Sequence, residues 1–342
     1  MSLSSLAPVA IVGAGLAGLS CAQALQAAGV PVQLFEKSRG PAGRMSTRRG
    51  EGWQCDHGAQ YFTARDPEFR AELARWQAAG VATPWQPRLR VFGPSPAERG
   101  KSETERFVGL PQMTAPARWL AQSLPLHVQA TVQGLQRRAD GAWQLQLAEA
   151  EHQALAAQAF AAVLLAVPAP QAAPLLAGHS EALRARAAAA RMRGSWALML
   201  RYEQALDLDF DAAFVNQGPL RWVARDSSKP GRALAGSGET WLLHAEAEWS
   251  EANLELTPEQ ASEPLLAAFA ELGGRAPDQL AVHRWRYADS APPLTLGCDW
   301  DAAAGLGLCG DWLMGGKVEG AWRSGRALAQ ALLNARAASL TS

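Results

Sequence analysis

Cysteine and histidine are too few and too scattered in this sequence to build a metal site or a disulfide framework. The four cysteines are Cys21, Cys55, Cys298 and Cys309, and no two of them form a Cys-x-x-Cys pair. The six histidines are spread along the chain without the short spacing of metal ligands. We therefore expect no metal site, free thiols and a reducing compartment.

The chain also lacks an excess of charge and a long apolar run. Lys and Arg number 32 and Asp and Glu number 32, so the formal net charge is zero. A nucleic-acid-binding protein would normally carry a basic face. No apolar run approaches the roughly 18 residues of a membrane-spanning helix, and no basic residue precedes Lys37, as a signal peptide would require. We expect a cytoplasmic protein with no nucleic-acid partner and no membrane partner, and the oligomeric state stays open.

What remains is a composition typical of a large packed protein. The chain has 342 residues, of which 48% are hydrophobic and 19% are charged. That balance argues against disorder. Because a domain holds about 150 residues on average, the length favours two domains.

The first 36 residues predict the beginning of a parallel α/β sheet. Residues 9–12 are a short apolar run, a glycine cluster follows, and residues 16–28 have the composition and spacing of a helix that Gly29 would end. Residues 32–35 then form a second apolar run. A strand, a glycine turn, a helix and another strand in this order are typical of a βαβ unit.

Later segments predict further strands of the first domain and a second, mostly antiparallel sheet. Strands are expected at residues 126–135, 143–147, 163–167 and 306–309, and strands of the second sheet at 196–202, 220–224, 241–245 and 282–285. Helices are expected at residues 184–191, 258–272 and 319–334. A turn at Ala139-Asp140-Gly141 separates two of these strands.

The glycine turn carries a dinucleotide-binding fingerprint in the required context. Gly13, Gly15 and Gly18 form a Gly-x-Gly-x-x-Gly motif between a predicted strand and a predicted helix. The first glycine permits a tight turn, the second lets a pyrophosphate approach the backbone, and the third lets the helix pack on the strand. Glu36 ends the second strand, where a carboxylate would bind an adenosine ribose. These residues predict nucleotide binding, and they do not distinguish NAD from FAD.

A second match to the same motif is misleading. Gly305, Gly307 and Gly310 also fit Gly-x-Gly-x-x-Gly, but they precede and interrupt a predicted strand instead of following one. We therefore reject this match as a nucleotide site.

Four segments resemble the flavin-containing amine oxidase superfamily, and most closely its renalase-like FAD enzymes. The segments are 39–48, 56–62, Gly310-Asp311 and 317–322. The family has paired glycines where this chain has Ala42-Gly43, and a methyl group there would affect how the loop approaches the phosphates. The resemblance spans residues 9 to about 333 and implies FAD, bound without a covalent link.

The resemblance also implies positions for individual residues. It places Glu36 on the adenosine ribose, Arg44 at the pyrophosphate, Gly58 to Tyr61 beside the isoalloxazine, the Val132 backbone beside adenine and Asp311 on the ribityl or phosphate groups. Arg44 also suits phosphate by its forked guanidinium, although a surface ion pair is the alternative. The expected cofactor-binding residues are Gly13, Ala14, Gly15, Leu16, Ala17, Gly18, Glu36, Lys37, Arg44, Gly58, Ala59, Gln60, Tyr61, Val132, Gly310, Asp311, Val318, Glu319, Gly320 and Ala321.

The helix that begins near Glu319 is expected to tune the flavin. If its first N–H groups, around Gly320 and Ala321, point at the flavin N1 and C2 carbonyl, they stabilise the negative charge that appears when N5 accepts a hydride. A helix end stabilises a charge by at most about 2 kcal/mol. Positioning of the substrate must therefore supply much of the remaining catalytic effect. An amine oxidase often also places a lysine near N5, and Lys317 is the one near this segment.

The expected second domain carries six of the 13 tryptophans, interleaved with arginine and histidine. These aromatics are either ordinary core, the lining of a pocket for a planar ligand, or a surface for a partner. On a strand, His283, Trp285 and Tyr287 share one face and Arg284 and Arg286 the other. The substrate-pocket residues that we expect are Trp285, Tyr287 and His244.

These expectations combine into one architecture and three functions. We predict an α/β fold with a Rossmann-like FAD-binding domain from residues 1–80, 112–170 and 290–342, and an α+β substrate domain from 81–111 and 171–289. By resemblance, the protein oxidises 2- or 6-dihydro isomers of NAD(P)H and passes the electrons to O2, giving H2O2. The alternatives are a flavin oxidase of small amines and a flavin-binding protein without catalysis.

Overall fold

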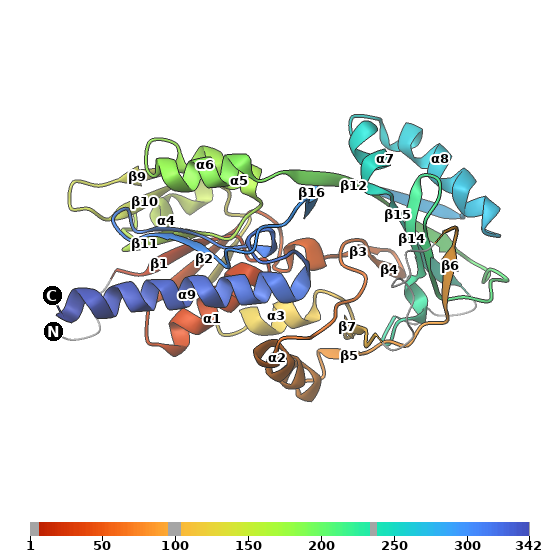
Figure 1. Ribbon diagram of the computed structural model, residues 1–342, viewed down its shortest axis with the longest axis horizontal. Helices are drawn as coiled ribbons and strands as arrows, with labels where there is room; N and C mark the ends of the chain where they lie inside the picture. Colours follow the sequence, from red (N-terminus) through yellow and green to blue (C-terminus); the bar gives the residue numbers. More distant parts are fainter. Residues whose placement is uncertain (1–6, 95–103, 233–237, 342) are drawn as a thin grey trace. The chain divides into compact units, whose positions relative to one another are not determined.

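The chain divides into two compact units in the computed structural model, which describes residues 7–94, 104–232 and 238–341 (Figure 1). Unit 1 comprises Met1–Gly43, Ala117–Met192 and Asp289–Ser342, and unit 2 comprises Arg44–Pro116 and Arg193–Ala288. Both units are therefore assembled from segments that are separated in the sequence.

A six-stranded sheet forms the centre of unit 1, in the order β17, β18, β11, β1, β2, β8. Its strands are β17 (Asp299–Asp301), β18 (Leu306–Leu308), β11 (Ala162–Leu165), β1 (Val9–Val12), β2 (Val32–Glu36) and β8 (Leu126–Val128). All neighbouring strands are parallel except β17 and β18. All four residues of β1 are buried, as expected for a central strand that is covered on both faces.

Helices and a hairpin cover this sheet. They are α1 (Leu16–Ala27), α4 (Gln153–Ala156), α5 (Ala169–Leu176), α6 (Glu181–Ala189), α9 (Lys317–Thr341), β9 (Val132–Arg137) and β10 (Trp143–Leu147), with the short η3 (Ala150–His152) and η5 (Asp311–Leu313). The apolar side chains of β9, β10, α5 and α6 form one core with one face of the sheet, where Val12, Leu165 and Leu308 are buried. The α/β fold with a Rossmann-like unit is thus confirmed.

Helices α1 and α9 lie side by side, although nearly the whole chain separates them (Figure 1). The Ser20 hydroxyl donates to the Trp322 carbonyl at 2.7 Å. A Cβ on Gly325 would lie 2.0 Å from the Ala17 carbonyl oxygen. Only glycine at position 325 therefore allows the two helices to approach this closely.

The segment predicted as one strand over residues 126–135 is two strands in different sheets. β8 ends at Val128 and β9 begins at Val132. Between them Gln129 has a φ of 52° and its N–H donates to the Ser38 carbonyl. This left-handed residue turns the chain away from the parallel sheet, so the continuous-strand prediction was wrong.

A second six-stranded sheet, in the order β16, β12, β15, β14, β13, β6, forms the centre of unit 2. Its strands are β16 (Gln279–Ser290), β12 (Met192–Tyr202), β15 (Glu239–Ala245), β14 (Leu220–Arg225), β13 (Ala212–Val215) and β6 (Leu89–Phe92). The pairs β12–β15, β15–β14 and β14–β13 are antiparallel, and β13–β6 is parallel. The mostly antiparallel second sheet is confirmed.

The helix α8 (Pro258–Glu271) covers one face of this sheet. Thr257 and Gln260 form a reciprocal capping box at its start, and Leu265 and Phe269 are buried with Trp241 of β15 in one core.

The remaining elements of the two units are α7 (Ala247–Ala252), η2 (Gly43–Met45), η4 (Asp226–Ser228), the pairs β3 (Thr47–Gly50) with β4 (Trp53–Asp56) and β5 (Ala82–Pro84) with β7 (Phe107–Gly109), α2 (Pro67–Ala78), and α3 (Ala115–Ala121). Most of α3 belongs to unit 1.

The units differ from the expected domain boundaries in two long segments, and in residues 112–116 and Asp289 as well. Residues 44–80, expected with the nucleotide-binding domain, belong to unit 2. Residues 171–192, expected with the substrate domain, belong to unit 1, where α5 and α6 pack on the core of the parallel sheet. Part of the expected segment 81–111 lies outside the described residues, namely residues 95–103, which include Lys101. Within the described part of the chain, no helix has the length and hydropathy needed to cross a bilayer.

Candidate functional site

The three fingerprint glycines of unit 1 have different environments. A Cβ on Gly13, whose φ is 99°, would lie 2.6 Å from the Ala166 carbonyl oxygen, and a Cβ on Gly18 would lie 2.0 Å from the Gly13 carbonyl oxygen. These two glycines are therefore required by the packing of the chain itself. A Cβ on Gly15 would meet nothing within 4 Å. Gly15 thus borders open space at the N-terminus of α1, where a pyrophosphate could approach.

Glu36 holds the fingerprint loop to the end of β2. Its carboxylate accepts hydrogen bonds from the Ala14 N–H at 2.9 Å and from the Ser38 N–H at 2.8 Å, and the residue is buried. A carboxylate has about four acceptor positions. Two of them therefore remain for the hydroxyls of a ribose, and the expected role of Glu36 stays a prediction.

The expected adenine contact lies next to Glu36. The Glu36 carbonyl accepts a hydrogen bond from the Ala130 N–H at 2.9 Å, and the Ser38 carbonyl accepts one from Gln129. Val132 follows two residues later, at the start of β9. Val132 is thus in the segment beside Glu36, whereas Lys37 is exposed between Glu36 and Ser38.

Asp311 reaches the same edge of the sheet from the C-terminal part of the chain. β1, β2 and β18 are parallel, so the fingerprint loop, Glu36 and Gly310-Asp311 all follow the carboxyl ends of their strands. Open α/β sheets bind ligands at this edge. The Gly310 N–H donates to Ser324 Oγ of α9, and Asp311 is buried. The rejected match, 305–310, contains β18. Only the three-residue 3₁₀ helix η5 follows it directly, and the next α-helix, α9, begins at Lys317.

Helix α9 begins at Lys317, two residues earlier than expected. Lys317 is exposed and has a φ of 68°. A Cβ on Gly320 would lie 2.3 Å from the Met314 carbonyl oxygen. Glycine at 320 is therefore required by the loop that precedes the helix, and sequence analysis did not anticipate this requirement. Val318 is buried and Glu319 and Ala321 are partly buried in this first turn.

Ala42, which replaces a glycine of the family pattern, has a backbone conformation that suits glycine. Its φ is 122° and its side chain is buried. The Ala42 N–H donates to the Ala14 carbonyl at 3.0 Å, and a Cβ on Gly43 would lie 3.4 Å from the Gly15 Cα. This strained residue therefore packs against the fingerprint loop.

In unit 2, a buried ionic cluster fixes the loop that contains Gly58 to Tyr61. The cluster, which we call the ionic cluster, consists of Asp56, Asp226, Lys229 and Arg232, whose side chains are all fully buried. Asp56 Oδ2 accepts from Arg232 Nη2 at 2.6 Å and lies 3.3 Å from Lys229 Nζ. Lys229 Nζ donates to Asp226 at 2.7 Å and to Gln60 Oε1 at 3.2 Å.

The ionic cluster is neutral overall, and its two carboxyl groups are inequivalent. Burial alone would raise the pKa of Asp56, but Lys229 and Arg232 outweigh burial and hold that pKa below its usual value. Burial raises the pKa of Asp226 to about 6. Removing one partner of such a cluster would leave a buried charge uncompensated, which typically costs about 3–5 kcal/mol. Sequence analysis missed this cluster because 170 residues separate Asp56 from Asp226.

The loop after Asp56 is held by its own side chains as well. Gln60 Nε2 donates to the Asp56 carbonyl at 2.6 Å and to the Gly58 carbonyl at 3.2 Å. A Cβ on Gly58 would lie 2.0 Å from the Arg44 carbonyl oxygen, which accepts the Ala59 N–H at 2.9 Å. The Arg44 guanidinium donates to the Ala288 carbonyl at 3.3 Å. Its expected role at a pyrophosphate stays a prediction.

Two of the expected pocket residues converge on the His57 backbone. The His57 carbonyl accepts hydrogen bonds from His244 Nε2 at 3.0 Å and from Trp285 Nε1 at 2.9 Å. Because a carbonyl only accepts, His244 carries its proton on Nε2 when neutral. Burial lowers the pKa of His57 to about 3 and that of His244 to about 4, so both rings are neutral at pH 7.

The predicted alternation along β16 is confirmed. The Trp285 ring stacks on His57 with centroids 5.2 Å apart and meets His283 edge-on at 4.4 Å. On the opposite side of the strand, Arg284 and Arg286 both pair with Glu255. Tyr287 follows on the face of Trp285 and is partly buried.

A pocket of about 250 Å³ lies beside the loop in unit 2. It is lined by Gly58, Ala59, Gln60, Tyr61, Phe214, Arg221, Trp222 and His244. This set, which we call the aromatic pocket, includes His244 but not Trp285 or Tyr287, whose role in binding substrate stays a prediction. Phe214 and Trp222 meet edge-on at 4.8 Å, and Tyr61 lies 5.5 Å from Trp222. The lining contains no carboxylate.

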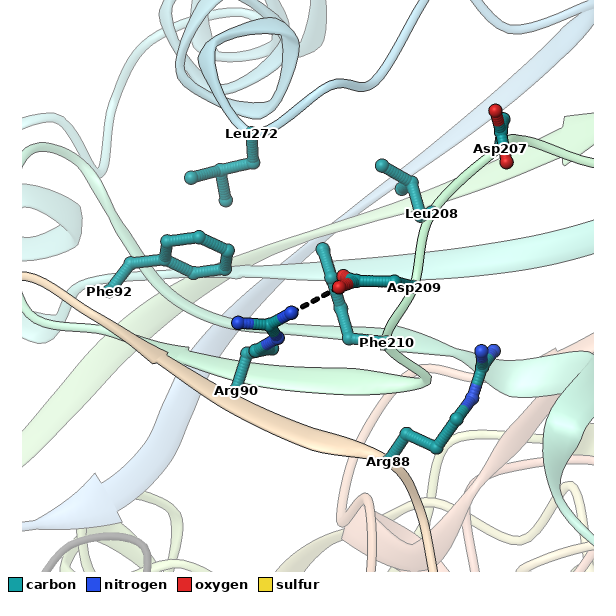
Figure 2. Close-up of a pocket in the computed structure, with 8 residues that line it drawn as sticks. All are labelled: Arg88, Arg90, Phe92, Asp207, Leu208, Asp209, Phe210 and Leu272. Carbon is teal, nitrogen blue, oxygen red and sulfur yellow. Dashed lines mark hydrogen bonds and ion pairs between the residues drawn. The ribbon is translucent and has the colours of Figure 1, made fainter.

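A second cavity of unit 2, of about 570 Å³, lies between β6 and the segment 207–210 (Figure 2). Both of its arginines are paired, because Arg90 pairs with Asp209 and Arg88 binds Asp211 through two nitrogens. No expected site residue lines it. Among the described residues, no group of three or more side chains could hold a metal ion.

These features are those of a dinucleotide-binding protein, and the comparison with known proteins makes the class specific. The family described as flavin containing amine oxidoreductase matches residues 65–333, and the family described as NAD(P)-binding Rossmann-like domain matches residues 11–76. Since the first match covers most of the chain, the chain belongs to the flavin-containing amine oxidoreductase family. It is an oxidoreductase whose cofactor is FAD.

Individual relatives share the fold or a short segment. A lycopene-forming phytoene desaturase of Pantoea ananas is 41% identical over 66 residues, which span 19% of this chain but only 13% of the desaturase. The crystal structure of an Exiguobacterium sp. 255-15 protein described as a protoporphyrinogen oxidase matches 97% of this chain and 99% of its own, with a TM-score of 0.74 and 13% identity. Cyclohexylamine oxidase from Brevibacterium oxydans IH-35A matches 96% and 99%, with a TM-score of 0.69 and 13% identity. At such identities the structural matches show the fold alone.

The residues of unit 1 fit FAD. The open space at Gly15, the free acceptor positions of Glu36 and the buried Asp311 lie at one edge of the parallel sheet, as a dinucleotide requires. They would hold the pyrophosphate, the adenosine ribose and the ribityl chain, respectively.

Gly15→Asp is expected to abolish FAD binding and leave the fold intact. The carboxylate would repel the pyrophosphate, whereas the Cβ of the new residue would meet no atom within 4 Å. Gly15 is also the N-cap of α1, with a φ of −70° that aspartate adopts readily. FAD titration followed by flavin fluorescence, together with thermal unfolding of the FAD-free protein, measures both effects. Retained FAD affinity would contradict the assignment of the loop, and the unfolding curve controls for misfolding.

Ala42→Gly is expected to stabilise the protein by about 1 kcal/mol, because glycine adopts a φ of 122° without strain. Chemical denaturation measures the change. Ala79→Gly is the matched control, since exposed Ala79 has an ordinary φ of −79°, and its replacement should give no gain. Equal effects of the two substitutions would contradict the argument from backbone strain.

Acid is expected to destabilise the protein below pH 6.5. In the unfolded chain His57 and His244 take up protons near pH 6.5, but in the folded protein only near pH 3 and 4. Their contribution is therefore fully present above pH 6.5 and is lost as the pH falls. Asp226, whose pKa is raised, opposes this between about pH 6 and 4, so the net loss of unfolding free energy from pH 7 to 5 is on the order of 2 kcal/mol.

Urea denaturation at pH 7 and pH 5 measures this loss. His244→Gln keeps an N–H donor for the His57 carbonyl but cannot titrate, so its loss should be clearly smaller than that of the parent protein. The same pH dependence in both proteins would show that His244 is not buried in its neutral form.

Proposed function

We propose that the protein is an FAD-dependent oxidase of dihydronicotinamide dinucleotides that carry the hydride at the 2 or 6 position, as in renalase-like enzymes. We assign the pyrophosphate, the adenosine ribose and the ribityl chain of FAD to unit 1, and substrate binding to the aromatic pocket of unit 2. The loop from Gly58 to Tyr61, which the resemblance places beside the isoalloxazine, forms part of that pocket. When bound, FAD accepts the hydride and passes the electrons to O2, which gives H2O2.

The composition of the aromatic pocket carries this proposal. Tyr61, Phe214 and Trp222 offer ring faces and edges, and Arg221 is the one charged residue among the eight that line the pocket, since His244 is neutral. Flat apolar walls with a single cation suit a planar ring attached to an anionic group. A protonated amine would find no carboxylate there, which disfavours the small-amine alternative.

The pocket has the size of one ring system. About 250 Å³ accommodates a nicotinamide head group and leaves no space for a whole dinucleotide, so the remainder of the substrate would lie outside the pocket. The ionic cluster holds Gln60, and thereby one wall of the pocket, in a single orientation. A rigid wall favours a defined position of the ring, on which hydride transfer depends.

The chain's lysines give little support to an amine oxidase. Lys317 is exposed at the first residue of α9. Lys229 is buried, and its ammonium group donates hydrogen bonds to Asp56, Asp226 and Gln60. Neither lysine supports the role that the amine-oxidase alternative would give it.

Anaerobic reduction of the flavin tests the proposal. The absorbance near 450 nm should bleach with the 2- or 6-dihydro isomers of NAD at least about 100-fold faster than with ordinary NADH or with putrescine, and H2O2 should appear once air is admitted. Bleaching by amines alone would favour the amine oxidase. Bound flavin that no compound reduces would favour the non-catalytic alternative and contradict the proposal.

A further inference from the structure

Arg221 is displaced from the regular register of its strand. In the pair β14–β15, Leu220 faces Ala245 and Trp222 faces His244, so one residue of β14 stands against none of β15. The residue at this irregularity is Arg221. Such a bulge redirects a side chain.

The bulge explains why Arg221 and Trp222, which are adjacent on one strand, line the same pocket. Successive residues of a strand point to opposite faces, so Arg221 and Trp222 should not line one cavity. Both line the aromatic pocket. Trp222 keeps its regular place between Phe214 on β13 and His244 on β15. The bulge therefore brings an arginine to a wall that would otherwise be aromatic.

The charge of Arg221 is not compensated by a neighbouring acid. Among the described residues, Arg221 forms no ion pair, and none of the residues that line the pocket is acidic. The arginines of the cavity in Figure 2 differ, since Arg88 and Arg90 are held by Asp211 and Asp209. The next cation, Lys229, is neutralised within the ionic cluster. The aromatic pocket thus has one free positive charge, and Arg221 also contributes to the lowered pKa of His244.

We propose that Arg221 is the residue that selects substrates with an anionic group, by binding a phosphate of the substrate through its guanidinium. A guanidinium offers paired donors to phosphate oxygens, and an exposed arginine without an acid partner loses little on binding. This inference rests on the proposed function, and it adds a specificity-determining residue that the fold alone does not identify.

Single-turnover reduction with matched substrates tests the role of Arg221. The probes are the 6-dihydro forms of NAD, which has two phosphates, and of nicotinamide riboside, which has none. Arg221→Met should raise the apparent Kd for the dinucleotide about 10- to 100-fold, as expected for a lost charge-assisted hydrogen bond. The limiting rate of reduction and the Kd for the riboside should stay within about twofold of the parent values.

Two further variants separate charge recognition from packing. Arg221→Lys keeps the charge and should recover part of the affinity for the dinucleotide. Arg90→Met removes an exposed arginine of the same sheet that is already paired with Asp209, and it should change nothing. Equal changes for the dinucleotide and the riboside in Arg221→Met, or no change for either, would overturn the proposal.

Failure of the proposed function gives a different result. If the parent flavin is reduced by neither probe, the substrate assignment is wrong, and calorimetric titration of the FAD-loaded protein with oxidised NAD⁺ decides the role of Arg221. Binding that weakens at least about tenfold in Arg221→Met supports recognition of an anion. Equal affinity of parent and variant, or no binding to the parent, overturns it.

Discussion

The hydrogen bond from the Ala14 N–H to the Glu36 carboxylate is the contact on which the nucleotide site of unit 1 depends. It ties the turn after β1 to the end of β2, and it holds the N-terminus of α1 at the carboxyl edge of the sheet. Gly13 and Gly18 let the turn pack this tightly, whereas Gly15 keeps the space in front of the helix open. The positive end of the α1 dipole and the N–H groups of its first turn then favour a phosphate at this point.

Unit 2 depends on a different kind of interaction. Two carboxylates and two cations, all buried, compensate one another below the loop with Gly58 and Gln60. Burial of this kind contributes little net stability but penalises every arrangement that separates the partners. The loop, the neutral histidines around the His57 carbonyl and the aromatic pocket therefore keep one geometry. Among the described residues that line the pocket, Arg221 carries the one uncompensated charge.

Local sequence predicted the parts of the fold that are local. β1, α1 and β2 follow one another within 28 residues, and apolar spacing with the glycine turn was enough to predict them. The strand expected over 126–135 failed because the bond from Gln129 to Ser38, a residue almost 100 positions away, turns the chain. The compact units differ from the expected domains for a similar reason, since Asp56 binds Lys229 and Arg232 of unit 2, far away in the sequence.

The parts of the candidate site that are local in the sequence could also be predicted. A contiguous pattern was enough to predict the fingerprint loop and Glu36, and aromatic surroundings suggested His244; the roles of these residues stay predictions. The role of Arg221 could not be predicted, because alternation along a regular strand places it away from Trp222, and only the bulge reverses this. Trp285 was expected in the pocket, but its indole N–H binds the His57 carbonyl and its ring covers His57, which sequence could not indicate.

The flavin content of the purified protein tests the central claim most directly. Precipitation with acid should leave a yellow supernatant that contains one FAD per chain, because the proposed site holds the cofactor at Gly15, Glu36 and Asp311 without a covalent bond. A protein that is colourless, and that stays colourless after incubation with excess FAD and removal of the unbound cofactor, would contradict the account.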